Sequence, residues 1–129
     1  MAEKTSDRKT LFLDIIAQTI FDKKGFNILA LDVHHISTMS DYCIIAEGTV
    51  ERHVKSLYNA IVGVCEKLSI PVYHAEGQSV GDWIVIDCAE VVVHLMTPDL
   101  REKYALEDLW RKAKIVDVAI DVKKRPLVE

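Results

Sequence analysis

The segment "DWIVIDCAEVVVHLM", residues 82 to 96, decides the fold predicted for this chain. Two short apolar runs, residues 83–87 and 91–96, are separated by Cys88, Ala89 and Glu90. Runs of this length that are rich in Val and Ile are typical of β-strands. The segment therefore predicts an antiparallel hairpin, although its turn lacks the glycine that such turns favour.

Helical periodicity appears on both sides of this hairpin. Apolar residues recur at helical spacing over residues 11–20, and Lys23, Lys24 and Gly25 form a plausible helix end with Gly25 in a left-handed conformation. A longer helix is predicted from Val50 onward, with Thr49 as its cap. Steps of four and three give it one apolar stripe, which consists of Val50, Val54, Leu57, Ile61, Val64 and Leu68.

A third helical stretch follows the hairpin. Thr97, Pro98 and Asp99 are a good helix start, because proline favours the first helical position. The helix is expected to break near Tyr104. Leu106, Leu109 and Trp110 then share one apolar face, which we assign to the core.

Further strands are predicted at residues 27–33, 42–48 and from residue 71 onward. The stretch "IVDVAIDV", residues 115–122, alternates enough to be a strand, and it could pair within the chain, with another subunit, or not at all. This order of elements favours an α/β (α+β) fold with a mixed β-sheet and flanking helices. At 129 residues the chain is expected to form one domain.

Composition narrows the classes of function. The net charge of −4 disfavours wrapping of a phosphate backbone as the main activity. The one dense basic cluster, Lys123, Lys124 and Arg125, is interpreted as a solvated tail, with a secondary RNA contact as the alternative. No apolar run is long enough to cross a bilayer, and residues 1–10 do not resemble a targeting segment. With three widely spaced cysteines, these features predict a cytoplasmic protein whose thiols are reduced.

No catalytic constellation emerges from the motifs. The five glycines form neither a phosphate-binding loop nor a dinucleotide fingerprint. His34 and His35 point to opposite faces if they lie on a strand, so a solvated loop is favoured over a metal site. His94 is interpreted as a histidine satisfied by a backbone or carboxylate partner rather than as a catalytic base, because no nucleophile adjoins it. We therefore expect no enzyme activity, no metal and no cofactor.

Trp83 is the residue most suited to a binding surface. It follows a Gly-Asp pair at the start of its strand, where a large ring is often partly exposed. Aromatic side chains in such places anchor protein partners, so both a core role and a partner contact stay open at this point.

Several motifs in the same order resemble the ribosomal silencing factor family, also called Iojap-like or RsfS. They are "ALDV", "SDYCIIAEGTVERHVKSL", "AEG" and "DWIVIDCAEVVVHLMTPDLREKYALEDLW". The resemblance covers about residues 28 to 110, and we assign a single domain to residues 1–113 and a tail outside the resemblance to residues 114–129. It implies a fold akin to nucleotidyltransferases without their catalytic carboxylates.

The resemblance also implies a function and a binding surface. Members of the family bind large-subunit ribosomal protein fourteen (L-fourteen), block the joining of the ribosomal subunits and lower translation under nutrient limitation. They commonly form homodimers. Carried to this sequence, the partner-binding positions are Trp83, Asp87, Cys88 and Tyr104, while Val92 and His94 are expected in the interior. A nucleotide-binding or vestigial nucleotidyltransferase-like protein is the alternative.

Two departures from the family pattern concern local structure. The hairpin turn reads Asp87-Cys88-Ala89-Glu90 where the family usually has Asp-x-Gly-Asp, so the turn is expected to differ in shape. "AEGTV" stands where the family usually has a Thr-Gly or Ser-Gly pair followed by Ser or Thr, so the capping of the long helix is expected to differ in detail while the fold stays the same.

Overall fold

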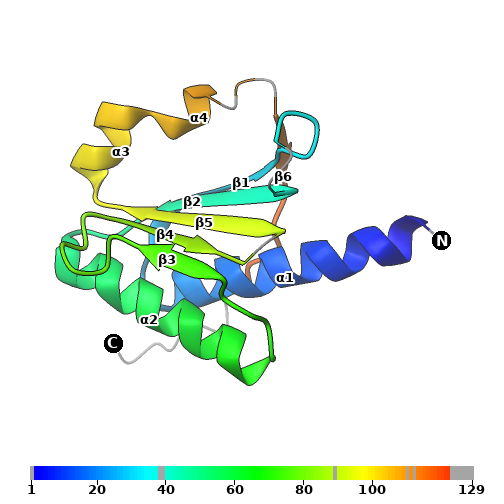
Figure 1. The fold of residues 1–129 in the computed structure, drawn as a ribbon, viewed down its shortest axis with the longest axis horizontal. Helices are drawn as coiled ribbons and strands as arrows, with labels where there is room; N and C mark the ends of the chain where they lie inside the picture. Colours follow the sequence, from blue (N-terminus) through cyan, green and yellow to red (C-terminus); the bar gives the residue numbers. More distant parts are fainter. Residues whose placement is uncertain (1, 38–39, 89, 110, 112, 123–129) are drawn as a thin grey trace.

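Six strands form one mixed sheet in the order β3-β4-β5-β2-β1-β6 (Figure 1). The structure is a computed structural model, and it describes residues 2–37, 40–88, 90–109, 111 and 113–122. The strands are β1 (Phe26–Asp32), β2 (Tyr42–Glu47), β3 (His74–Glu76), β4 (Trp83–Asp87), β5 (Val91–Met96) and β6 (Lys114–Val116). The helices are α1 (Ala2–Asp22), α2 (Glu51–Lys67), α3 (Pro98–Tyr104) and α4 (Leu106–Leu109).

The pairing of the strands confirms the mixed sheet and the hairpin. β4 and β5 pair antiparallel, with Trp83 opposite Met96 and Asp87 opposite Val92. β2 and β5 pair in parallel, and the remaining neighbours pair antiparallel. A parallel pair needs a long crossover, which here consists of α2, β3 and β4. The likeness to nucleotidyltransferases stays a prediction.

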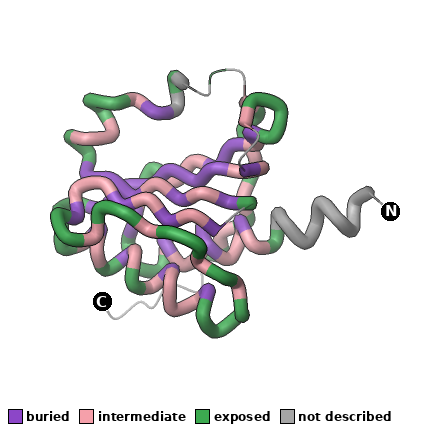
Figure 2. The backbone as a smooth tube through the Cα atoms, viewed as in Figure 1, coloured by how far each residue is buried: buried purple, intermediate pink, exposed green. Residues whose placement is uncertain are grey.

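The helices lie on both sides of the sheet (Figure 1). α1 and α2 cover one face, and α3 and α4 lie over the other. Alternation along each strand sends side chains to these two faces in turn. Ile84, Ile86, Val93 and Leu95 belong to the larger core cluster, beneath α1 and α2. Burying side chains of this size contributes about 1.5–3 kcal/mol each, so this layer holds the fold together. Figure 2 shows buried residues along the strands of the sheet.

A second, smaller core cluster lies on the opposite face. Its buried members are Leu31, Val33, Cys43, Ile45, Met96 and Leu106. Leu106 is therefore a core residue as predicted, whereas Trp110 and the side chain of Leu109 lie outside the described residues. The break between α3 and α4 also falls where it was expected, since Ala105 takes a left-handed conformation with φ of 47°.

The apolar stripe of α2 is confirmed in its middle and wrong at its ends. Val54, Leu57 and Ile61 are buried, but Val50 and Leu68 are 54% and 47% exposed. Both end residues are caps rather than members of the helix, so their side chains leave the buried face. The predicted cap was also wrong, because Val50 and not Thr49 is the N-cap.

The end of α1 differs from its prediction in one residue. Lys24, with φ of 70°, adopts the left-handed conformation that was expected of Gly25. Gly25 is required for another reason: a Cβ atom there would lie 2.4 Å from the side chain of Ile20 and 3.2 Å from that of Leu57. Because Gly25 has no side chain, its backbone can lie close to the buried side chains of Ile20 and Leu57.

The segment after residue 113 joins the same sheet. β6 pairs antiparallel with β1, with Leu31 opposite Ile115. Beyond it, the backbone N–H of Ala119 donates to the carboxylate of Asp14 at 2.8 Å, and that of Asp121 donates to Gln18 at 2.6 Å. The stretch whose pairing was open therefore pairs within the chain and then runs along α1.

Candidate partner-binding surface

Part of the second sheet face lies outside both core clusters. Alternation places Trp83, Val85, Asp87, Val92 and His94 on this face, and all five are half-buried. We call these five residues the open face. Of its apolar members, Trp83 packs against the smaller core cluster, whereas Val85 and Val92 are packed against neither cluster. Val92 and His94, expected in the interior, are half-buried on this face, whereas Val91, Val93 and Leu95 are the fully buried residues of β5 on the α1–α2 side.

Trp83 and His94 form a hydrogen-bonded pair across β4 and β5. The indole Nε1–H of Trp83 donates to Nδ1 of His94 at 3.1 Å. His94 thus has a side-chain partner, but the partner is an indole rather than the backbone or carboxylate group expected. Burial lowers the pKa of His94 from 6.5 to about 4, so the ring is neutral near pH 7 and can accept this bond.

Tyr104 extends the open face at the end of α3. Its ring centroid lies 5.0 Å from that of Trp83, with the planes tilted by 42°, and 47% of the residue is exposed. Such tilted pairs contribute about 0.5–1.5 kcal/mol beyond the area that they bury. Two of the four predicted site residues are thus in direct contact, with one ring half-buried and the other available to a partner.

Asp87 and Cys88 lie at the other end of β4. A strand of this length separates Trp83 from Asp87 by roughly 13 Å. Asp87 is half-buried on the open face, but Cys88 is only 6% exposed and belongs to the larger core cluster. There the thiol of Cys88 hydrogen-bonds to Cys65, and this bond together with burial raises the pKa of Cys88. The side chain of Cys88 therefore faces away from the open face.

The loop before β4 depends on Gly77. Its φ is 94°, and a Cβ atom would lie 2.0 Å from the backbone oxygen of Trp83. Only glycine combines this conformation with so close an approach. The residue thereby supports the start of β4, where the indole of Trp83 is placed.

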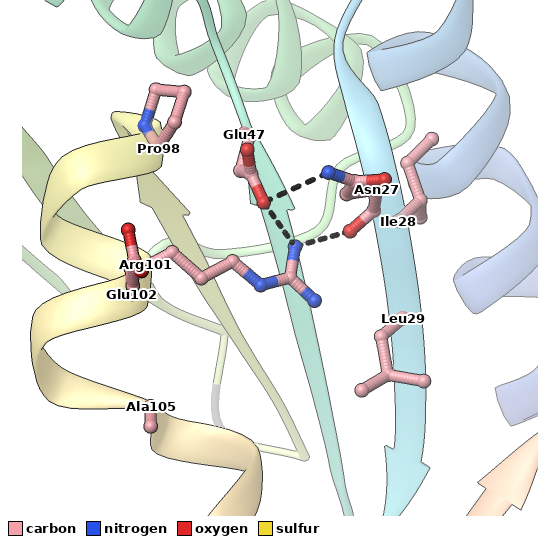
Figure 3. A pocket seen from close by; sticks show the side chains of 8 residues that line it. All are labelled: Asn27, Ile28, Leu29, Glu47, Pro98, Arg101, Glu102 and Ala105. Carbon is pink, nitrogen blue, oxygen red and sulfur yellow. Dashed lines mark hydrogen bonds and ion pairs between the residues drawn. The ribbon is translucent and has the colours of Figure 1, made fainter.

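A cavity of about 590 Å³ lies beside α3, on the same side of the sheet (Figure 3). Its lining consists of Asn27, Ile28, Leu29, Glu47, Pro98, Arg101, Glu102 and Ala105. Arg101 forms an ion pair with Glu47 at 3.3 Å, and the side chains of both are nearly buried, at 11% and 9% exposed. Residue spacing does not predict this pair, and the one signal in the sequence is the glutamate that ends the otherwise apolar strand "YCIIAE".

The structure offers no arrangement typical of a metal centre in the part of the chain that it describes. No group of His, Cys, Asp and Glu side chains there could hold a metal ion. The ring of His34 instead hydrogen-bonds to Asp32, and His34 and His35 contact each other with ring centroids 3.7 Å apart. Among the same residues, no helix has the length and apolar character that a membrane crossing needs.

Comparison with known proteins identifies relatives of this chain. Residues 5–127 match the family model described as "Ribosomal silencing factor during starvation", so the match extends past residue 113. The chain is 35% identical over 98 residues to "Ribosomal silencing factor RsfS" of Haemophilus influenzae, which covers 76% of this chain and 96% of that protein. It is 28% identical over 120 residues to "Mitochondrial assembly of ribosomal large subunit protein 1" of Mus musculus, covering 91% of this chain and 53% of that one.

A solved structure carries the same fold. The crystal structure of a protein from Chromobacterium violaceum superposes with a TM-score of 0.76 at 28% identity, covering 88% of this chain and 94% of that one. The family is one of ribosome-associated regulators of translation. The sequence match and the shared fold together show that this chain belongs to the ribosomal silencing factor (RsfS) family.

Proposed function

We propose that the chain binds the large ribosomal subunit through large-subunit ribosomal protein fourteen (L-fourteen) and thereby blocks association with the small subunit. A folded body of 14.6 kDa on that surface occupies space that the small subunit needs. Translation is repressed under nutrient limitation without any bond being made or broken, so the chain is not an enzyme. The cytoplasmic location, predicted from the sequence features, and the homodimer of the free chain, implied by the family resemblance, belong to the same proposal.

The observation that carries the proposal is the contact between Trp83 and Tyr104 at the edge of the open face. Hot spots of protein interfaces are enriched in Trp and Tyr, which provide large rigid surfaces with a polar group at one end. Val85 and Val92 continue the apolar surface along β4 and β5, and Asp87 adds a carboxylate at its far end. The open face thus has the apolar centre and polar rim of a protein interface.

Cys88 has a more limited part in this surface. Its side chain is buried, but its backbone N–H donates to the oxygen of Val91 and its carbonyl accepts from Glu90, each at 2.9 Å. The residue therefore fixes the turn between β4 and β5. Its contribution to the partner contact comes from the shape of this turn rather than from the thiol.

Alanine substitution of the two rings tests the proposed surface. We expect Trp83→Ala and Tyr104→Ala each to weaken binding to purified large subunits by about 2 kcal/mol, or about thirtyfold. Leu68→Ala is the matched control, because Leu68 is as exposed as Tyr104, at 47%, but caps the helix on the other side of the sheet. Circular dichroism checks that each variant is folded.

The outcome of the subunit-joining assay decides the mechanism. Sedimentation of mixed subunits should show fewer joined ribosomes with the native chain and with Leu68→Ala, and more with the two ring variants. Unchanged affinity in both ring variants would refute the assignment of this surface. Joining that proceeds normally with the chain bound would refute steric blocking.

The nucleotide-binding alternative finds little support in the described residues. The cavity beside α3 is lined by two carboxylates, Glu47 and Glu102, and by a single guanidinium, that of Arg101. An acidic lining of this kind repels phosphate groups. Calorimetry with nucleoside triphosphates and magnesium is expected to give no binding heat. A secondary RNA contact through Lys123, Lys124 and Arg125 falls on residues outside the described part, and it would appear as affinity that drops steeply with salt.

A further inference from the structure

α3 carries Tyr104 but is weakly held by apolar contacts. None of its residues is buried, and Leu100 is its partly buried member that packs on the smaller core cluster. Its start is fixed by Thr97, whose backbone N–H donates to the oxygen of Asp82 at 3.0 Å. Just beyond its end, Leu106 is buried in the same cluster, and a polar contact within α3 adds to these attachments.

Arg101 supplies that contact (Figure 3). Its side chain reaches from α3 to the sheet, where NH1 lies 3.3 Å from Oε2 of Glu47 and donates to the backbone oxygen of Asn27. The side-chain amide of Asn27 donates to the same carboxylate oxygen at 3.1 Å. We call Arg101, Glu47 and Asn27 the polar clamp. It connects α3 to β2 and β1 at once.

The backbone of β1 is shaped to receive the guanidinium. The register of β1 with β2 shifts between Phe26 and Leu29, so Asn27 lies in a bulge. Asn27 has φ of 51°, a left-handed conformation that asparagine tolerates better than most residues. A bulge interrupts the hydrogen-bond ladder and redirects the backbone, which makes the oxygen of Asn27 available to Arg101.

The charges of the clamp make it specific for Arg101. A carboxylate as buried as that of Glu47 is costly without a cationic partner, and one guanidinium can serve both the carboxylate and the carbonyl. Glu47 occupies a position where the family resemblance led us to expect threonine or serine. The clamp thus gives this chain an ionic connection to α3 at that position.

We infer that Arg101 is a positioning residue for the partner-binding surface: by holding α3 on Glu47 and Asn27, it keeps the ring of Tyr104 against that of Trp83. Tyr104 follows Arg101 by three residues, which is nearly one helical turn, so a displacement at Arg101 is transmitted to the tyrosine. This inference rests on the proposed function, because it deepens the assignment of the same surface.

A double-mutant cycle on the affinity for large subunits tests the inference. We expect Arg101→Ala to weaken binding by roughly tenfold, a part of the loss expected for Tyr104→Ala. The double variant should bind no more weakly than Tyr104→Ala alone, since Arg101 acts through the tyrosine. Additive losses would overturn the inference, because Arg101 would then contact the partner itself. Arg52→Ala, which removes an exposed arginine from α2, controls for the lost charge.

A measurement without the partner separates this inference from the proposed function. In a Trp110→Phe background, Trp83 is the one remaining tryptophan, and its emission reports on the ring contact. Arg101→Ala should shift the emission to the red as Tyr104→Ala does, Arg101→Lys should restore part of the native spectrum, and Arg52→Ala should leave it unchanged. A native spectrum in Arg101→Ala would overturn the inference, even if the affinity falls.

Glu47→Gln provides a second variant if Arg101→Ala fails to fold. It keeps the size of the side chain and removes the charge, so we expect a smaller red shift in the same direction, and a native spectrum would count against the clamp. If Trp83→Ala and Tyr104→Ala both bind normally, the proposed surface fails. The emission of the free chain still decides whether the clamp positions Tyr104.

Discussion

Acidification is expected to destabilise this chain through His94. Nδ1 of the ring accepts the indole N–H of Trp83, and protonation of Nδ1 would place two donors against each other. Burial lowers the pKa of His94 from 6.5 to about 4. Between these pH values the unfolded chain binds a proton at this residue and the folded chain does not, so stability rises with pH. The stability that the neutral ring of His94 contributes is fully present above about pH 6.5, and it is lost progressively as the pH falls to about 4.

The size of the effect follows from the two pKa values. Each tenfold change in proton affinity corresponds to about 1.36 kcal/mol, so the difference between 6.5 and about 4 gives at most about 3.4 kcal/mol. Because His94 is half-buried rather than fully buried, solvent screens part of this, and we expect roughly 2 to 3 kcal/mol. This is a large part of the 5–15 kcal/mol typical of a domain.

Urea unfolding at a series of pH values between 7.5 and 4 measures the effect. His94→Asn is the reference, because its side-chain oxygen can accept the indole N–H at the position of Nδ1 but does not titrate in this range. The free energy of unfolding of the native chain should fall by roughly 2 to 3 kcal/mol more than that of the variant. Parallel pH profiles for the two proteins would refute the role given to His94.

The remaining predictions concern the stability of the fold, each measured by urea unfolding at pH 7.5. Gly77→Ala is expected to destabilise the chain by more than about 1 kcal/mol, because its φ is 94° and the new Cβ would meet the oxygen of Trp83. Gly63→Ala in α2 is expected to stabilise it by about 0.5–1 kcal/mol, since nothing lies within 4 Å of the new Cβ, and a loss there would contradict this reasoning. Ile61→Ala is expected to cost about 2–5 kcal/mol and Leu68→Ala less than about 0.5, and equal losses would show that the burial of Ile61 has been misjudged.

The hairpin and the long helix were predictable because their signals are local. Val, Ile and Leu make up most of residues 83–87 and 91–96, and the stripe from Val54 to Ile61 has helical spacing. The side of the sheet on which Val92 and His94 lie was not predictable. β5 has apolar residues on both faces, so its sequence reads as one continuous run and alternation gives no direction.

The candidate site was predictable only in part. Trp83 and Tyr104 were selected by their residue types and by family resemblance, and the structure brings their rings together. The ion pair of Glu47 and Arg101 joins residues far apart in the chain. The clamp around it also depends on the bulge at Asn27, which no local sequence pattern predicts. The inward direction of the Cys88 side chain likewise follows from the pairing of β4 with its neighbours rather than from the turn residues.

The pairing of β6 with β1 has a consequence for how the chain emerges during synthesis. β1 is the first strand to be made, and β6 follows every other element of the sheet. Until β6 has been made, one edge of β1 has unpaired backbone groups that another strand could join. The nascent protein is therefore most prone to faulty association in the interval before its sixth strand arrives, and a chain that stops short of residue 114 would carry this hazard permanently.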